Sequence, residues 1–407
     1  MRLLFVAPYL PTPGSGGRTR FVNLLDRVSR DHEVRVVCFR ERDQLEDPLP
    51  YPGIALDPPP LRKRPGGLAG KFRFYGERLD PLPAFAAQLF MPEMAAAIRD
   101  ETARFRPDLV QIETTEMGQY LRAIPFGPVR ALDLQDVAHG WFERVAQRAG
   151  TPKARGTLRY ELMRTRRYDR NICRTAELVF VPSELEADRI RELAGIEPVI
   201  VANGVDTAYF STDAAFEPVP FDPDRILFVG PMTYIANLDA VRWFGSEVLP
   251  LVRSRRPAAR LVTVGTPTEE ALPTGVEAVG RVDDLRPWYA ASPVSVVPVR
   301  IGSGTRYKIL EAFSMGRAVV STEVGAEGLG ATHEEHLLLA DDPEGFAEAV
   351  VLALEDADLR ARLGKAGRVL VVANYDWEPL VQTMTEAWED LIEELLEPRQ
   401  DLPADDR

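Results

Sequence analysis

Cysteine is scarce in this chain, and long apolar runs are missing. The only two cysteines, Cys38 and Cys173, lie far apart without metal-ligand spacing, which excludes a disulfide framework and favours a reducing compartment. The apolar start MRLLFVAPYL is too short for a transmembrane helix and runs into PTPGSGG without the small-residue pattern of a cleaved leader. We therefore expect a cytoplasmic protein that begins with a β-strand.

Positive charge is in deficit overall but not in every part of the chain. The net charge is −13, and no basic module rich in aromatic residues occurs, which argues against a nucleic-acid partner. Residues 1–200 nevertheless hold 31 Lys/Arg against 27 Asp/Glu, whereas residues 201–407 hold 18 against 35. Two halves of opposite sign suggest two domains.

The densest basic segment is PKARGTLRYELMRTRRYDRNICR, residues 152–174. It carries eight Lys/Arg against Glu161 and Asp169. Such a segment could meet an anionic membrane surface, as at the inner face of a membrane, or a phosphorylated partner. A solvated helix face with no partner explains it equally well.

Short apolar runs alternate with helical patterns in both halves, which predicts parallel α/β units. Residues 43–83, rich in Pro and Gly, receive no assignment, and the Pro- and Asp-containing stretch FEPVPFDPD separates the two halves. Two α/β domains in tandem are the simplest architecture. The expected strands are 3–8, 33–39, 107–113, 129–134 and 176–183 in the first half, and 225–230, 260–265, 276–282, 294–299 and 317–322 in the second.

Two glycine-rich loops follow predicted strands and precede helical patterns. In GSGGRTR, Gly16 and Gly17 with Arg18 would let backbone amides approach a ligand at a helix start. Ligands of parallel sheets bind at the carboxyl ends of the strands, so we expect both loops at a ligand site. Neither loop is a G-x-G-x-x-G fingerprint, and no Walker A sequence occurs, so NAD binding and ATP hydrolysis are disfavoured.

The second loop, in RIGSGTRYKILEAFSMG (300–316), places Arg306 and Lys308 in the first turn of a predicted helix. The helix dipole disfavours cations there. A phosphate on the free N–H groups of that helix end would reverse the effect and make both cations favourable. Glu311, one turn further on, would point an acceptor at the same ligand. An ordinary solvated loop is the alternative.

An ordered set of motifs resembles the family 4 glycosyltransferases of the GT-B fold over nearly the whole chain. Residues 179–210, with Asn203 in N-G-V-D, resemble the domain junction, and RILFVGPMTYIANLDAVRWF, with Gly230, resembles the start of the nucleotide-binding domain. The segment from GRVDD to VVST resembles the donor site. The resemblance implies two facing Rossmann-like domains with a cleft between them: an acceptor domain 1–205, a donor domain 206–376, a helix 377–397 that crosses back, and a tail 398–407.

The resemblance implies transfer of a sugar from a nucleotide diphosphate sugar to a glycan, lipid-linked or small-molecule acceptor, as in polysaccharide biosynthesis. It also implies retention of the anomeric configuration without a metal or other cofactor. Arg306 and Lys308 would then stabilise the departing diphosphate, Glu311 would bind the ribose hydroxyls, and Asp283 would lie near the base. The remaining donor-site residues on this reading are Asn203, Gly230, Gly302, Ser303, Gly304 and Thr305.

Departures from the family pattern keep other functions open. Ser303 replaces a glutamate that contacts the donor sugar, and Gln135, which cannot titrate, stands where many members carry a histidine. Asp136, Glu113 and His139 are candidates to bind or orient the acceptor, with plain structural roles as the alternative. A nucleotide-sugar epimerase or hydrolase would need one of them as a base. A non-catalytic nucleotide-sugar-binding module would need none.

Overall fold

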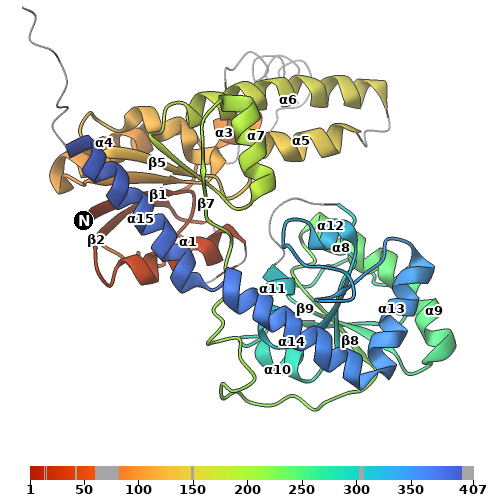
Figure 1. The fold of residues 1–407 in the computed structure, drawn as a ribbon. Coiled ribbons are helices and arrows are strands. Elements are labelled where there is room, and N and C mark those ends of the chain that lie inside the picture. The colour runs from red at the N-terminus through yellow and green to blue at the C-terminus, as the bar shows by residue number, and fades with distance from the viewer. Residues whose placement is uncertain are drawn as a thin grey trace, which may run out of the picture. The chain divides into compact units, whose positions relative to one another are not determined.

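The structure is a computed structural model that describes residues 1–12, 14, 16–41, 44–59, 82–147, 151–301 and 307–396. The chain divides into two compact units, each built around its own sheet (Figure 1). Unit 1 contains Met1–Ala202 and the chain from Val381 onward, and unit 2 is Asn203–Leu380. The boundary thus falls at 202/203, whereas the sequence placed it at 205/206. The last helix, α15 (Trp377–Leu396), begins in unit 2 and continues in unit 1.

Unit 1 contains a seven-stranded parallel sheet in the order β3-β2-β1-β4-β5-β6-β7. All five predicted strands are confirmed, because runs such as LLFVA are buried on both faces, as parallel strands are. The sequence did not predict β3, in the unassigned segment, or the two-residue β7. The bounds are β1 (Arg2–Ala7), β2 (Glu33–Phe39), β3 (Gly53–Leu56), β4 (Leu109–Glu113), β5 (Val129–Asp133), β6 (Leu178–Val181) and β7 (Val199–Ile200).

Helices connect these strands and carry the expected end signals. In α6, Pro152 occupies the first turn, where its missing N–H costs nothing, and the Thr151 hydroxyl accepts from the Ala154 N–H. From α15, the Trp388 indole packs edge-on against Phe5 and Phe180 in the unit 1 core. The described helices of unit 1 are α1 (Gly17–Val28), α3 (Ala84–Gln88), α4 (Pro92–Phe105), the 3-10 helix η1 (Thr115–Ala123), α5 (Ala138–Gln147), α6 (Pro152–Cys173) and α7 (Glu184–Ala194).

Unit 2 contains a six-stranded parallel sheet in the order β10-β9-β8-β11-β12-β13. All five predicted strands are present, and the two-residue β13 is additional. The strands are β8 (Arg225–Val229), β9 (Arg260–Val264), β10 (Val276–Gly280), β11 (Val294–Val297), β12 (Ala318–Ser321) and β13 (Leu338–Leu339). The described helices are α8 (Ile235–Trp243), α9 (Leu249–Arg255), α10 (Arg286–Ala290), α11 (Tyr307–Ser314), α12 (Glu323–Ala326), α13 (Pro343–Glu355) and α14 (Ala357–Asn374).

The helical segment over residues 235–255 is interrupted near its middle. A π-helical turn at Phe244–Val248 joins α8 to α9, and Pro250 lies two residues beyond it. Because proline has no N–H and its ring crowds the preceding turn, a regular α-helix cannot run through this position undisturbed.

The strand orders locate one ligand-binding edge in each unit. In unit 1 the order reverses between β1 and β4, and in unit 2 it reverses between β8 and β11. Loops that leave neighbouring strands in opposite directions open a crevice at their carboxyl ends. Candidate site residues are therefore expected after β1, β4 and β5 in unit 1, and after β8, β9 and β11 in unit 2.

Candidate functional site

In unit 1, four predicted or neighbouring residues meet at the carboxyl ends of β1, β4 and β5. The Gln135 side chain accepts from the Tyr9 hydroxyl (3.0 Å) and donates through Nε2 to Glu113 (3.0 Å). Gly17, the first residue of α1, lies against them: a Cβ there would be 2.0 Å from Gln135 Oε1. Only glycine allows the helix to begin this close to the glutamine.

Glu113 belongs to a buried chain of hydrogen bonds with a fixed direction. Its other oxygen accepts from Gln111 Nε2 (2.8 Å), and Gln111 Oε1 accepts from the indole N–H of Trp388 (3.1 Å). Since indole can only donate, Trp388 fixes the orientation of the Gln111 amide. Burial, followed by the charge of Asp133, raises the pKa of Glu113 to about 8.

A buried arginine, Arg20, neutralises the charge of Asp133, the carboxylate beside Glu113. Arg20 from α1 is 1% exposed and donates to both oxygens of Asp133, at 2.6 and 3.1 Å. It also donates to the carbonyls of Val201 and Ala202. Because Arg20 is engaged by Asp133 in this bidentate pair, Glu113 has amide donors as its nearest partners.

Asp136 and His139 follow the same strand, β5. Asp136 accepts a hydrogen bond from Thr115 at its backbone carbonyl (2.7 Å). His139 is 3% exposed, and its Nδ1 lies 2.9 Å from the carboxylate of Asp169 in α6, a carboxylate whose pKa is raised by burial. This contact holds α5 against α6, so for His139 the structure favours the packing role that the sequence left open beside catalysis.

The glycine loop of unit 1 is described only in part. Gly16 has φ +61° and precedes α1 as a residue without a side-chain cap, which leaves the first amides of the helix pointing outward. Arg18 forms an ion pair with Glu41 and donates to Gln44 (3.3 Å). Its charge is therefore already shared with a carboxylate, which weakens its predicted role as a phosphate ligand.

In unit 2, a second cluster forms after β8, β9 and β11. The Lys308 ammonium donates to Asn237 Oδ1 (2.9 Å) and lies 4.8 Å from the centre of the Phe228 ring. Gly230 has φ +151°, and a Cβ there would lie 2.7 Å from Asn237 Nδ2 and 3.3 Å from Lys308 Nζ. At Gly265 a Cβ would meet the Gly230 carbonyl oxygen at 2.3 Å. The bare backbone of Gly230 therefore lies beside one fixed ammonium group, and Gly265 lets the end of β9 pack against the Gly230 carbonyl.

Glu311 lies one helical turn from Lys308 and is also held in place. The hydroxyl of the buried Tyr289 donates to Glu311 Oε2 (2.7 Å) and lies 3.3 Å from the Lys308 carbonyl. Burial raises the pKa of Glu311, and Lys308 opposes that shift. Asp283 is exposed in the loop after β10, and Asn203 is buried at the start of the unit.

Five predicted donor-site residues, Gly302, Ser303, Gly304, Thr305 and Arg306, lie outside the described residues, so their roles stay predictions. Sequence reasoning missed Tyr289 and Gly265. The glycine that ends the run RLVTVG was a signal for the second, but nothing local marked the first. In the described ranges, no group of three or more His, Cys, Asp or Glu side chains is arranged to hold a metal.

Comparison with known families identifies the chain. Residues 14–209 match the model described as Glycosyltransferase Family 4, and residues 223–356 match the model described as Glycosyl transferases group 1. The chain belongs to the family 4 glycosyltransferases. Among curated relatives, phosphatidyl-myo-inositol mannosyltransferase of Mycolicibacterium smegmatis is 29% identical over 46% of this chain and 50% of its own length. The chain thus spans about a third to a half of the length of the first curated relatives that it matches.

Solved structures extend the likeness of this family 4 member to the whole fold. Sucrose-phosphate synthase from Thermosynechococcus elongatus has a TM-score of 0.68 at 18% identity and covers 97% of this chain and 99% of its own. Anabaena HepE, solved in complex with UDP, has a TM-score of 0.67 at 14% identity and covers 96% and 100%. The two parallel α/β units are the Rossmann-like domains of the GT-B fold, as the sequence predicted.

Proposed function

We propose that this protein is a glycosyltransferase of hexosyltransferase type. It transfers a sugar from a nucleotide diphosphate sugar to a glycan, lipid-linked or small-molecule acceptor, with retention of configuration and without a metal. The observation that carries the proposal is the unit 2 cluster, in which Lys308 is fixed beside the bare backbone of Gly230. Family membership over both halves of the chain supports it.

The unit 2 cluster has the chemistry that a departing nucleoside diphosphate requires. An ammonium group already oriented by Asn237 stabilises developing phosphate charge without reorganising during the reaction. Glycine backbone without Cβ atoms allows phosphate oxygens to approach closely. Glu311, oriented by Tyr289, is an acceptor suited to ribose hydroxyls. HepE, which was solved with UDP, makes a uridine donor the first to test.

The unit 1 cluster supports retention and an acceptor site. An inverting displacement uses a general base in contact with the acceptor hydroxyl. Gln135 cannot titrate, Glu113 is fully buried, and His139 is almost so. Of the candidate bases named from the sequence, this leaves the partly exposed Asp136, whose proposed role is to bind the acceptor. Gln135 would instead orient the reacting sugar, with Asp136 beside it. The phosphatidyl-myo-inositol mannosyltransferases among the relatives make a lipid-linked acceptor worth testing, and polysaccharide assembly is the proposed setting.

The proposed location is the cytoplasm. Cys38 and Cys173 are both buried free thiols, an arrangement typical of a reducing compartment. No helix within the described residues is long and apolar enough to cross a bilayer.

The deciding experiment measures both the consumption of the nucleotide-sugar donor and the product that is formed. Protein is incubated with UDP-, GDP- and ADP-sugars, with and without a cell-envelope extract as the acceptor source, and with and without EDTA. We expect release of one nucleoside diphosphate that the extract accelerates and EDTA does not change. Comparison of the anomeric configuration in the product linkage with that in the donor tests retention.

The other functions give different results in the same assay. A hydrolase would release diphosphate equally with and without the extract, an epimerase would change the sugar without releasing diphosphate, and a binding module would do neither. Lys308→Ala should abolish release, whereas Lys365→Ala, which removes an exposed lysine of α14, should not. Equal release by both variants would refute the assignment of Lys308.

A further inference from the structure

Helix α6 uses its two acidic residues internally and leaves five of its six arginines facing solvent. Asp169 is 1% exposed and bonded to His139, and Glu161 accepts from Arg164 (2.8 Å). On an ordinary solvated helix, acids and bases alternate along the exposed face. The exposed charged side chains described on α6 are instead all cationic: Arg155, Arg159, Arg166, Arg167 and Arg170.

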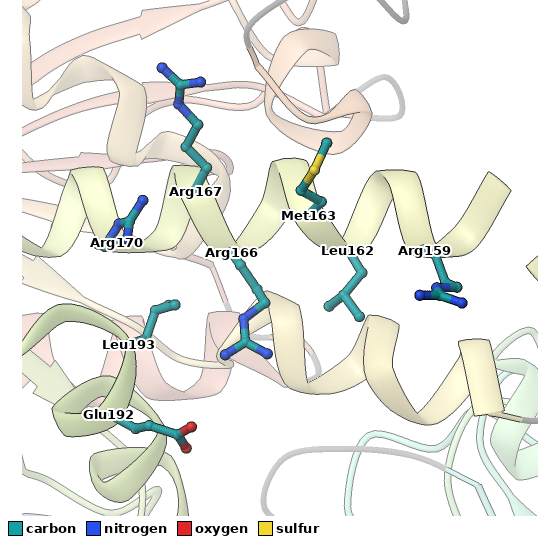
Figure 2. Close-up of a pocket in the computed structure, with 8 residues that line it drawn as sticks. All are labelled: Arg159, Leu162, Met163, Arg166, Arg167, Arg170, Glu192 and Leu193. Carbon is teal, nitrogen blue, oxygen red and sulfur yellow. The ribbon is translucent and has the colours of Figure 1, made fainter. Parts of the chain in front are cut away.

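Four of these arginines line a groove of about 550 Å³ beside α7 (Figure 2). Arg166 donates to Glu143 of α5 (3.1 Å), and Glu192 of α7 lies at the groove. The other three arginines, Arg159, Arg167 and Arg170, form no ion pair with any residue that the structure describes. The groove therefore carries more positive charge than its own carboxylates balance.

Because of their spacing on α6, the exposed arginines form a stripe along the helix. Arg159, Met163, Arg166 and Arg170 follow one another at i, i+4, i+7 and i+11, so they share one face of the helix, and Arg167, four residues after Met163, borders that face and belongs to the stripe. At 1.5 Å per residue the stripe is about 16 Å long. A single phosphate engages one or two guanidinium groups, whereas a row of this length matches a surface that carries many phosphates.

An apolar side chain interrupts the arginines. Met163 is 60% exposed in the middle of the stripe, and Leu162 and Leu193 add apolar lining to the groove. Cationic heads beside an exposed apolar side chain are typical of helices that lie in a membrane interface, where arginines reach phosphates and apolar groups enter the acyl boundary. A soluble phosphorylated partner would give no reason for Met163 to be exposed.

We propose that the stripe on α6 docks this protein peripherally on an anionic phospholipid surface. The guanidinium groups bind lipid phosphates, and Met163 inserts at the boundary of the acyl chains. Each arginine near such a surface contributes about 1 kcal/mol, or about a fivefold change in binding. Neutralising the three arginines that have no carboxylate partner among the described residues should weaken binding by roughly a hundredfold.

Sedimentation with vesicles tests the proposal on the full chain. We expect the protein to sediment at low salt with vesicles of phosphatidylglycerol and phosphatidylcholine in equal parts, but not with phosphatidylcholine alone. Added salt should release it, because the attraction is screened. The R159Q/R167Q/R170Q variant should lose this binding, and Met163→Ser should weaken it while the charge stays unchanged.

A matched variant controls for total charge. R99Q/R122Q/R281Q removes three exposed arginines elsewhere and alters the net charge by the same amount, so it should sediment like the wild type. Circular dichroism establishes that each variant is folded. The proposal is overturned if the wild type stays in solution with anionic vesicles, or if both triple variants bind equally. Binding to soluble polyphosphate without binding to vesicles would also overturn it, and would indicate a phosphorylated soluble partner.

Discussion

Replacing Glu113 with glutamine should reverse the donor and acceptor roles of Gln135 in the buried hydrogen-bond chain of unit 1. Trp388 can only donate, so Gln111 keeps its Nε2 turned toward position 113. The new glutamine must then turn its oxygen to Gln111 and its NH₂ group to Gln135. Two NH₂ groups cannot bond to each other, so the Gln135 amide must flip. After the flip its NH₂ group faces the Tyr9 hydroxyl, which can accept.

The flip should leave stability nearly unchanged and reduce catalysis. Every buried group is still bonded after the flip, so the free energy of unfolding should change by less than about 1 kcal/mol. On the proposed role, in which the remaining Nε2 hydrogen of Gln135 bonds to the reacting sugar, the flip would present an oxygen where the wild type presents an N–H. A hydrogen bond replaced by a mismatched pair costs about 1–3 kcal/mol. We therefore expect kcat/KM for sugar transfer to fall by roughly five- to 150-fold.

The assay is release of nucleoside diphosphate, with thermal unfolding as the measure of fold. The swapped variant Q111E/E113Q provides the decisive control. A carboxylate at position 111 accepts from both Trp388 and the glutamine at 113, whose oxygen again accepts from Gln135, so the wild-type orientation returns. Turnover should recover in the swap. Wild-type turnover in Glu113→Gln, or a swap that is folded but as slow as the single variant, would refute the reasoning.

Further predictions concern pH, packing and nucleotide binding. Because the pKa of Glu113 rises from 4.5 to about 8 on folding, the native state binds the extra proton, and the stability of unit 1 should fall as pH rises through this window. Urea unfolding should show this loss of stability between acidic and mildly alkaline pH, and Glu113→Gln should remove it. Gly17→Ala should lower stability by about 1–3 kcal/mol through overlap, whereas Gly156→Ala, with open space inside α6, should raise it slightly in the same thermal assay. Tyr289→Phe should weaken calorimetric binding of UDP severalfold but leave binding of dideoxy-UDP unchanged, since it releases only Glu311.

The sequence predicted the elements of this fold better than the contacts within its sites. Buried strands such as β1 and β8 are continuous apolar runs, so composition alone marks them. The two-residue strands β7 and β13 contain too few positions to form a pattern, and none of the four residues of β3 is fully buried. Their pairing depends on the neighbouring strand that is already in place.

Within the sites, sheet geometry predicted Gly17 at a ligand site, whereas Gln135 and Glu113 became candidates only by comparison with the family pattern. The sequence did not predict what orients them. The direction of the hydrogen-bond chain depends on Trp388, which is 277 residues from Gln111 in the sequence. In the same way, the Tyr289 hydroxyl reaches Glu311 only after α10 and α11 have packed on their sheet. Contacts of this kind have no local signature.

The central claim is that Lys308 and its neighbours in unit 2 bind the diphosphate of a nucleotide sugar. The most direct measurement is a thermal-shift titration of wild type, Lys308→Ala and Lys365→Ala with UDP, GDP, ADP and NAD, each with and without EDTA. The account predicts that one nucleoside diphosphate stabilises the wild type and Lys365→Ala by about 2.7 kcal/mol at a hundred times its dissociation constant. EDTA should make no difference, and Lys308→Ala should lose the effect. No shift with any diphosphate, a shift with NAD alone, or an undiminished shift in Lys308→Ala would contradict the account.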